Sequence, residues 1–221
     1  MDAAEVCAEL IGAVAIDHPV RVAIDGITAA GKTTFAEHLA SVLTADGRSV
    51  LRVSMDGFHN RRDVRYRQGR SSSDGYYEDA YDIDSLRRVL LDPLGPGGDL
   101  RYRASVLDLA SDVPTDDGPF DAEPGDVLIV DGSFLQKPEI RRSWDLVVFL
   151  RASFAAAAER GARRDAELLG GLDAARAAFR DRYHAAQRRY LAECDPEHLA
   201  DVVIDVEDPT APTVVDRRVP G

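Results

Sequence analysis

A nine-residue stretch, residues 26–34 (GITAAGKTT), constrains this chain more than any other part of the sequence. It matches the spacing G-x-x-x-x-G-K-[ST] and lies between an apolar run of strand length, residues 20–25, and a helical pattern. The glycines Gly26 and Gly31 allow backbone angles that turn the loop around a phosphate, with successive N–H groups pointing inward. A helix that begins at Lys32 adds the positive end of its dipole. The stretch therefore predicts a loop that binds the phosphates of a nucleotide.

Lys32 and Thr33 carry the chemistry expected of this loop. The Lys32 ammonium would reach the β and γ phosphates of a nucleoside triphosphate, and the Thr33 hydroxyl would bind Mg²⁺. Among the 27 Lys and Arg residues, only Lys32 and Lys137 are lysines, so a lysine at this position is informative. We therefore expect ATP and Mg²⁺ as cofactors. The residues expected to contact the nucleotide are Gly26, Ile27, Thr28, Ala29, Ala30, Gly31, Lys32, Thr33 and Thr34.

Apolar runs of strand length alternate with longer helical patterns over most of the 221 residues. Such alternation predicts βαβ units and a mainly parallel sheet, and continuously apolar runs indicate strands covered on both faces. The length allows one full α/β domain. The expected strands are residues 20–25, 49–55, 126–131, 145–150 and 201–206. The expected helices are residues 32–43, 83–91, 154–168 and 172–191, with a small hairpin within residues 99–110.

Composition and the N-terminal segment exclude several classes of protein. The formal net charge is −12, which disfavours binding to nucleic acid or to an anionic membrane. Residues 1–17 lack the basic start of a signal peptide and predict a short amphipathic helix instead. Cys7 and Cys194 form neither a metal-binding spacing nor a disulfide framework. We expect a cytoplasmic protein without a membrane or nucleic-acid partner.

Two aspartates directly follow apolar runs. Asp56 begins the sequence DGFH and Asp131 precedes Gly132, so both are expected at the carboxyl edge of the sheet, where ligands bind in open α/β folds. A kinase that acts on a hydroxyl needs a carboxylate to accept the hydroxyl proton, and Asp56 is the candidate. Asp131 is the candidate that holds Mg²⁺ and its waters together with Thr33. The alternative for Asp56 is a turn or capping role.

Arginines mark two further segments. Arg160, Arg163 and Arg164 are three and four residues apart and share one helical face, as expected for a lid that closes on a triphosphate and neutralises developing charge. The alternative is a solvated face paired with neighbouring acids. Five arginines also fall between residues 61 and 70, either in a solvated flexible loop or in a loop that folds over an anionic acceptor or regulator.

Some nucleotide-binding classes are disfavoured by missing motifs. The N-K-x-D sequence that reads guanine is absent, because the only asparagine, Asn60, is followed by Arg61. The stretch LLGGL at residues 168–172 is a poor match to the LSGGQ sequence of transporter ATPases. The sequence therefore favours a kinase over a GTPase or a transporter ATPase.

The combination GITAAGKTT, DGFH, YYEDAYDIDSL, VLIVDGSFL, RGARRD and LADVVID, in this order, resembles the uridine kinase-like group of P-loop kinases. That group includes relatives of phosphoribulokinase and pantothenate kinase. The resemblance covers residues 20–209 and implies a three-layer α/β fold with a five-stranded, mainly parallel sheet in the order 2-3-1-4-5, a small hairpin and a helical lid. The implied organisation is an N-terminal helix at residues 1–17, the kinase domain at 18–209 and a flexible tail at 210–221.

The same resemblance implies roles for individual residues. Asp56 matches the catalytic aspartate, and His59 stands where uridine kinases have a tyrosine that contacts the substrate. Asp79 matches an aspartate that binds ribose hydroxyls, and Tyr102 a tyrosine that lines the nucleoside pocket. The other implied catalytic or metal-binding residues are Lys32, Thr33, Asp131, Arg160 and Arg164.

We therefore expect an ATP-dependent kinase that transfers the γ-phosphoryl group to a small-molecule hydroxyl, with a nucleoside 5′-hydroxyl as the first candidate. Uridine kinases typically have D-S-F-Y where this chain has D-G-F-H, and D-G-F-H is closer to the sequences of pantothenate-kinase-like and sugar-kinase-like relatives. Pantothenate, a sugar or another small alcohol is therefore an alternative acceptor. A non-enzymatic alternative is an ATP-binding regulatory protein. Whether the protein forms homo-oligomers is left open.

Overall fold

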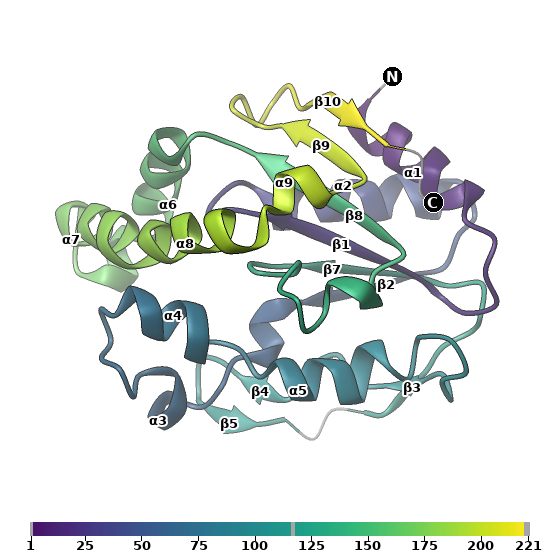
Figure 1. The fold of residues 1–221 in the computed structure, drawn as a ribbon, viewed down its shortest axis with the longest axis horizontal. Helices are drawn as coiled ribbons and strands as arrows, with labels where there is room; N and C mark the ends of the chain where they lie inside the picture. Colours follow the sequence, from purple (N-terminus) through teal and green to yellow (C-terminus); the bar gives the residue numbers. More distant parts are fainter. Residues whose placement is uncertain (1, 116–117, 219–221) are drawn as a thin grey trace.

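A six-stranded sheet forms the centre of the molecule (Figure 1). The computed structural model describes residues 2–115 and 118–218. The sheet has the order β10-β9-β8-β1-β7-β2, and all neighbouring strands are parallel except the pair β10–β9. Its strands are β1 (Val20–Gly26), β2 (Val50–Ser54), β7 (Val127–Asp131), β8 (Leu146–Arg151), β9 (Val202–Asp205) and β10 (Thr213–Arg217).

The five predicted strands and their order are confirmed, and the sheet has one strand more than predicted. Read from β2, the first five strands follow the chain in the order 2-3-1-4-5. The sixth, β10, is formed by residues assigned to a flexible tail. Its β-branched residues, Thr213 to Val215, favour a strand, and antiparallel pairing satisfies the N–H and C=O groups along the outer edge of β9.

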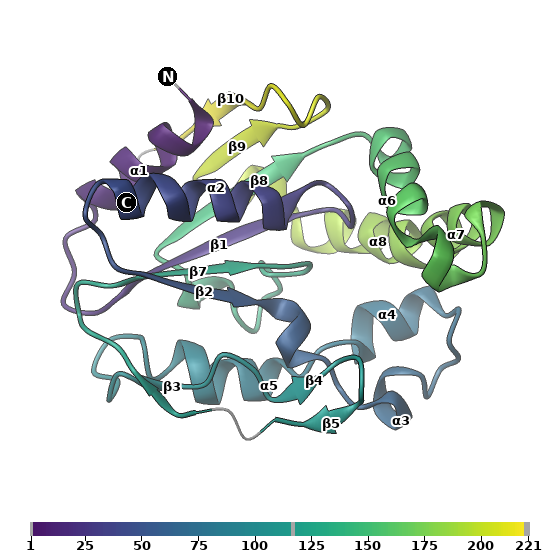
Figure 2. The ribbon, with the colours of Figure 1, turned by 180° about the vertical axis from the view of Figure 1, so that it is seen from behind.

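Helices cover both faces of this sheet, which gives the predicted three layers (Figures 1 and 2). On one face, α1 (Ala3–Ala13) and α2 (Lys32–Ala45) pack with alternate strand residues such as Val22 and Ile24. On the other face, α5 (Ile83–Leu86) and the π-helical η2 (Arg87–Leu91) pack over Ala23 and its neighbours. Burial of successive residues on opposite faces explains why these strands have continuous rather than alternating hydrophobicity.

Most of the remaining helices lie beyond the carboxyl ends of the central strands (Figure 1), whereas the short α9 (Pro196–Leu199) lies over the sheet beside β8. The predicted helix at residues 172–191 consists of two α-helices joined through a π-helical turn, and the last of them continues to Cys194. No helix of the described residues has the length and apolar character of a membrane span. The elements beyond the strand ends are α3 (Arg62–Arg65), α4 (Ser73–Asp79), α6 (Phe154–Leu169), α7 (Leu172–Ala178), η4 (Phe179–Tyr183) and α8 (His184–Cys194). Two short 3₁₀ turns of the described residues are η1 (Met55–Phe58), after β2, and η3 (Arg141–Ser143), before β8.

The predicted hairpin at residues 99–110 is misplaced. Instead, β3 (Arg101–Tyr102) pairs with β6 (Phe120–Asp121), and β4 (Leu107–Asp108) pairs with β5 (Val113–Pro114). The chain reverses after β4 because the Asp108 carboxylate accepts hydrogen bonds from the Ser111 N–H and hydroxyl, and Asp112 adopts a left-handed conformation. The sequence pattern shows an extended segment here but not where it turns.

The close approach of α6 to the loop after β1 depends on Gly161. A Cβ atom at this position would lie 2.1 Å from Phe179 Cζ in η4 and 2.9 Å from the Ala29 side chain. The absence of a side chain therefore lets α6 contact both η4 and the phosphate-binding loop.

Replacement of Gly161 by alanine should destabilise the protein although alanine is the better helix former. Helix propensity favours alanine by about 1 kcal/mol, but overpacking costs about 1–3 kcal/mol and displaces the loop. We expect a lower free energy of unfolding in denaturant titrations. Gly12→Ala is the matched control and should be neutral or stabilising, since Gly12 is helical and exposed and a Cβ atom added there would have no neighbour within 4 Å. Equal stability of both variants would contradict this packing account.

Candidate active site

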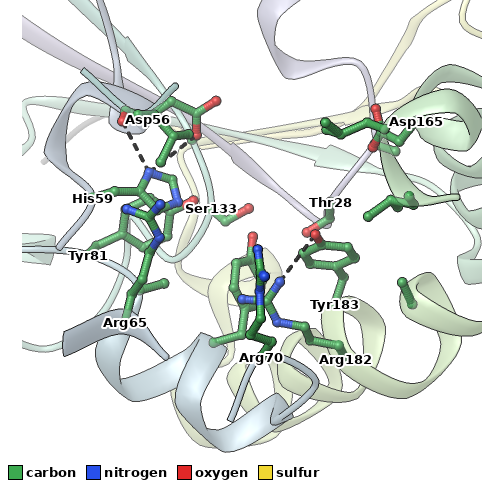
Figure 3. Close-up of a pocket in the computed structure, with 18 of the residues that line it drawn as sticks. Thr28, Asp56, His59, Arg65, Arg70, Tyr81, Ser133, Asp165, Arg182 and Tyr183 are labelled. Atoms are coloured by element: carbon green, nitrogen blue, oxygen red, sulfur yellow. Dashed lines mark hydrogen bonds and ion pairs between the residues drawn. The ribbon is translucent and has the colours of Figure 1, made fainter. Parts of the chain in front are cut away.

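A cavity of about 1130 Å³ opens at the carboxyl ends of β1, β2 and β7 (Figure 3). The loop after β1 contributes Thr28 and Lys32, the turn after β2 contributes Asp56, and the end of β7 contributes Asp131. On the opposite side it is lined by residues from α3, α4, α6, α7 and η4. Residues predicted from three separate sequence motifs therefore share one cavity.

The loop after β1 has the conformation that its sequence predicts. Gly31 is the N-cap of α2 in the left-handed region, with φ of 95°, and no side chain caps the first turn of the helix. Gly26 has φ of 148°, and a Cβ atom there would lie 2.7 Å from the Leu150 carbonyl oxygen. The first N–H groups of α2 are thus without a side-chain acceptor, which suits an anion at the helix N-terminus.

The Lys32 ammonium is held against this loop. Nζ donates hydrogen bonds to the carbonyl oxygens of Gly26 at 3.0 Å and Ile27 at 2.9 Å. Burial lowers the pKa of Lys32 to about 8, although Asp25 and Asp131 favour the charged form. At neutral pH the ammonium is therefore charged and lies in a partly desolvated position, where its attraction for a phosphate is stronger than in water.

A buried carboxylate behind the loop was not identified from the sequence. Asp25, in β1, is fully buried and accepts hydrogen bonds from the Gly26 N–H at 2.8 Å, Gln136 Nε2 at 3.1 Å and the Tyr190 hydroxyl at 2.5 Å. Burial raises the pKa of Asp25, while these three donors oppose the shift. The signal in the sequence is an acidic residue inside an apolar strand, directly before the motif glycine.

Thr33 and Asp131 form the predicted oxygen pair. Thr33 Oγ1 donates to Asp131 Oδ2 at 2.7 Å, and Arg52 Nη2, from β2, donates to Asp131 Oδ1 at 2.8 Å. A hydroxyl and a carboxylate are ligands that suit Mg²⁺. Within residues 2–115 and 118–218, no three His, Cys, Asp or Glu side chains cluster as a metal site, so the phosphates would have to supply further ligands. Arg52 was not singled out from the sequence.

Asp56 lies across the cavity from the loop, in the 3₁₀ turn η1. Its carboxylate is 69% exposed, and its Oδ1 is 3.9 Å from Nδ1 of His59, a ring nitrogen that also lies 3.1 Å from the Asp56 carbonyl oxygen. Burial lowers the pKa of His59, with the Asp56 charge opposing, and the ring packs on Tyr81 at 4.3 Å between centroids. At neutral pH a neutral imidazole therefore lies beside an accessible carboxylate.

The two predicted lid arginines take different positions on α6. Arg164 lines the cavity and binds Asp165 through two hydrogen bonds of 2.7 and 2.9 Å. Arg160 contacts the loop itself, since its Nε lies 3.4 Å from the Ala29 carbonyl oxygen. Its Nη2 is buried without a hydrogen-bond partner among the described residues. Arg163 instead forms an ion pair with Glu159.

Two predicted acceptor-binding residues do not line the cavity. Asp79 is buried, and its carboxylate forms an ion pair with Arg67 and accepts a 2.8 Å hydrogen bond from Gln68 Nε2. Tyr102 packs in the core and against the Phe120 ring. The geometry therefore does not support their predicted role. The opposite side of the cavity is lined by Arg65 and Arg70, from the arginine-rich segment at residues 61–70, and by tyrosines and an arginine not assigned a role above, which are Tyr66, Tyr76, Tyr81, Arg182 and Tyr183.

Comparison with solved structures identifies the fold of this chain. No family model matches the sequence, and no curated protein matches it. A solved structure described as a possible uridine kinase from Bacillus stearothermophilus is 25% identical with a TM-score of 0.71, covering 90% of this chain and 96% of its own. The chain has the fold of the uridine kinase-like P-loop kinases.

Two other solved structures show the same fold. A proposed fructose transport system kinase from Silicibacter is 24% identical with a TM-score of 0.72, covering 87% of this chain and 95% of its own. Phosphoribulokinase from Rhodobacter spheroides is 17% identical with a TM-score of 0.60, covering 93% of this chain and 76% of its own. The resemblance noted from the sequence motifs is thus confirmed at the level of the fold.

The lowered pKa of Lys32 predicts a pH-dependent affinity for triphosphate. A lysine loses its proton as the pH rises through its pKa, so the cation is lost above about pH 8. Because a bound polyphosphate favours the protonated form, the affinity should fall by up to about tenfold per pH unit above that value.

Calorimetric titration of ATP into the protein between pH 7 and 10 measures this dependence. Lys32→Arg is the control, since a guanidinium stays charged over the whole range and should flatten the profile whatever its absolute affinity. A wild-type affinity that does not change between pH 7 and 10 would show that this pKa is not lowered.

Proposed function

We propose that the protein is a magnesium- and ATP-dependent kinase that transfers the γ-phosphoryl group to a hydroxyl of a small molecule. The observation that carries the proposal is that one cavity joins the phosphate-binding loop to the exposed carboxylate of Asp56. A protein that only binds nucleotides needs the phosphate-binding loop, whereas phosphoryl transfer to an alcohol needs both the loop and a carboxylate that accepts the hydroxyl proton.

In this proposal each side chain acts by position and charge. Lys32 and the N-terminus of α2 bind the phosphates, and Arg164, from α6, stabilises charge on the transferring group. The acceptor oxygen forms a bond to the γ-phosphorus while the bond to the β–γ bridging oxygen breaks. The hydroxyl proton passes to Asp56, and ADP leaves.

Thr33 and Asp131 would hold Mg²⁺ together with phosphate oxygens and water. When bound, the ion neutralises charge on the phosphates. Arg52 fixes the orientation of the Asp131 carboxylate through their 2.8 Å hydrogen bond. Thr33 and Asp131 fit the ion because Thr33 Oγ1 and Asp131 Oδ2 are already adjacent, 2.7 Å apart.

Two candidate acceptors follow from the sequence and the comparisons. The structure described as a possible uridine kinase supports a nucleoside, while Asp79 and Tyr102, predicted to bind one, lie outside the cavity lining. A sugar or another small alcohol is supported by the kinase described for a fructose transport system, which has the same fold. The proposed acceptor is therefore a small alcohol, and phosphoryl transfer measured with a panel of alcohols would identify it.

Asp56→Asn separates a kinase from an ATP-binding regulator. The amide cannot accept the hydroxyl proton, so transfer should fall by about 10²–10⁴-fold, whereas binding of magnesium and ATP should be unchanged. A coupled assay of ADP release with nucleosides, pantothenate, sugars and hydroxy acids measures transfer, and calorimetry measures binding.

Lys32→Ala is the companion variant, because it should weaken triphosphate binding as well as turnover. Asp84→Asn serves as the control, since Asp84 is exposed on α5 and does not line the cavity. Full transfer activity in Asp56→Asn would refute the assigned base, and unchanged ATP binding in Lys32→Ala would refute the assigned loop.

A further inference from the structure

The acceptor side of the cavity carries an excess of positive charge in a chain whose formal net charge is −12. Five arginines line the cavity, and Arg164 is paired with Asp165 on the side of the phosphate-binding loop. Three of the others surround the ring of Tyr66, with guanidinium-to-centroid distances of 5.1, 5.1 and 5.5 Å. We call Arg65, Arg70 and Arg182 the arginine cluster.

The charges of this cluster are largely uncompensated. Arg65 binds Asp112 at 2.8 Å, but its Nε is buried and has no partner in the described part of the chain. Arg182 donates to the Tyr183 hydroxyl at 3.3 Å and its Nε is likewise buried without a partner. Over residues 2–115 and 118–218, neither Arg70 nor Arg182 pairs with a carboxylate.

The cluster shares one cavity with the proposed catalytic base. Arg65 Nη1 donates a 2.8 Å hydrogen bond to the carbonyl oxygen of Asn60, the residue after His59. Arg182 lies 5.0 Å from the centre of the Tyr76 ring, which packs beside Tyr81, the ring that contacts His59. The His59 ring is 3.9 Å from the Asp56 carboxylate. Figure 3 shows Arg65 beside His59 and Tyr81, and Arg70 and Arg182 further along the cavity, next to Tyr183. The cluster and Asp56 line the same cavity, so one ligand bound there can face both.

We propose that the acceptor is an alcohol that carries a phosphomonoester, bound by Arg65, Arg70 and Arg182 while its hydroxyl faces Asp56. This inference rests on the proposed function and narrows its substrate class. The γ-phosphorus gains a bond to the acceptor oxygen and loses its bond to ADP, and the hydroxyl proton passes to Asp56. The product would be a bisphosphate.

Charge balance favours this class over neutral and carboxylate acceptors. A phosphomonoester carries about −1.5 to −2 at neutral pH and offers three acceptor oxygens, which matches the two guanidinium groups, Arg70 and Arg182, that pair with no carboxylate of the described residues. A neutral nucleoside would leave these cations uncompensated while displacing their water. A carboxylate would balance only one of them.

Inorganic phosphate is the probe for this subsite. The protein is first saturated with magnesium and a non-hydrolysable ATP analogue, which fills the phosphate-binding loop, and phosphate is then titrated by calorimetry. We expect binding that weakens about tenfold in Arg70→Gln, since one charge-assisted contact is lost. Arg70 is exposed, so this variant should fold normally. Arg217→Gln, on the distant strand β10, removes the same charge and should bind like the wild type.

Arg182 packs among the rings of Tyr66, Tyr76 and Tyr183, so its substitution is tested as Arg182→Lys with a thermal melt. A folded Arg182→Lys should also bind phosphate more weakly, because an ammonium cannot form the bidentate contact of a guanidinium.

Three outcomes would overturn the proposal: no phosphate binding to the loaded protein, equal binding by Arg70→Gln and wild type, or tighter binding of acetate than of phosphate.

Failure of the proposed function would be visible separately. If the ATP analogue does not bind, the kinase proposal fails at the first step of the experiment. Phosphate titration of unloaded Lys32→Ala protein then still measures the arginine cluster, since the phosphate-binding loop is disabled. Phosphate binding by Lys32→Ala protein that depends on Arg70 would support the proposed subsite, and the absence of such binding would refute the subsite.

Discussion

The candidate site depends on the hydrogen bonds that the buried Asp25 carboxylate accepts. The carboxylate accepts hydrogen bonds from the Gly26 N–H, from Gln136 after β7 and from Tyr190 on α8. An isolated buried carboxylate is costly, so these three donors must stay in place for the fold to be stable. The loop that begins at Gly26 is thereby tied to two other elements. Lys32 is held in turn by the carbonyl groups of the same loop.

The central strands could be predicted because their burial is encoded locally. Strands covered on both faces have continuous apolar runs, and the motif at residues 26–34 fixes one strand–loop–helix junction in the middle of the sheet. Strand β10 could not be predicted in this way. Its outward residues are exposed, and its pairing with β9 is a long-range contact with no local signal. The turn after β4 likewise depends on side-chain contacts of Asp108.

The site was predictable where its residues follow strands directly. Asp131 ends β7, Asp56 follows β2 in the turn η1, and Lys32 follows β1 through the phosphate-binding loop, and parallel strands bring those ends to one edge. Asp79 was not predictable, because its buried ion pair with Arg67 joins α4 to a preceding loop. Arg182 lies in a π-helical turn whose side-chain direction differs from that of a regular helix, so helical periodicity does not place it in the cavity.

The central claim is that this cavity moves a phosphoryl group from ATP to a small-molecule hydroxyl. The most direct measurement uses the full chain, magnesium, ATP labelled in its γ-phosphoryl group and the small-molecule fraction of a cell extract, with mass spectrometry to identify labelled products. The account predicts that one class of alcohol gains the label. Label found only in inorganic phosphate or left in ATP, while the protein binds the nucleotide, would contradict it.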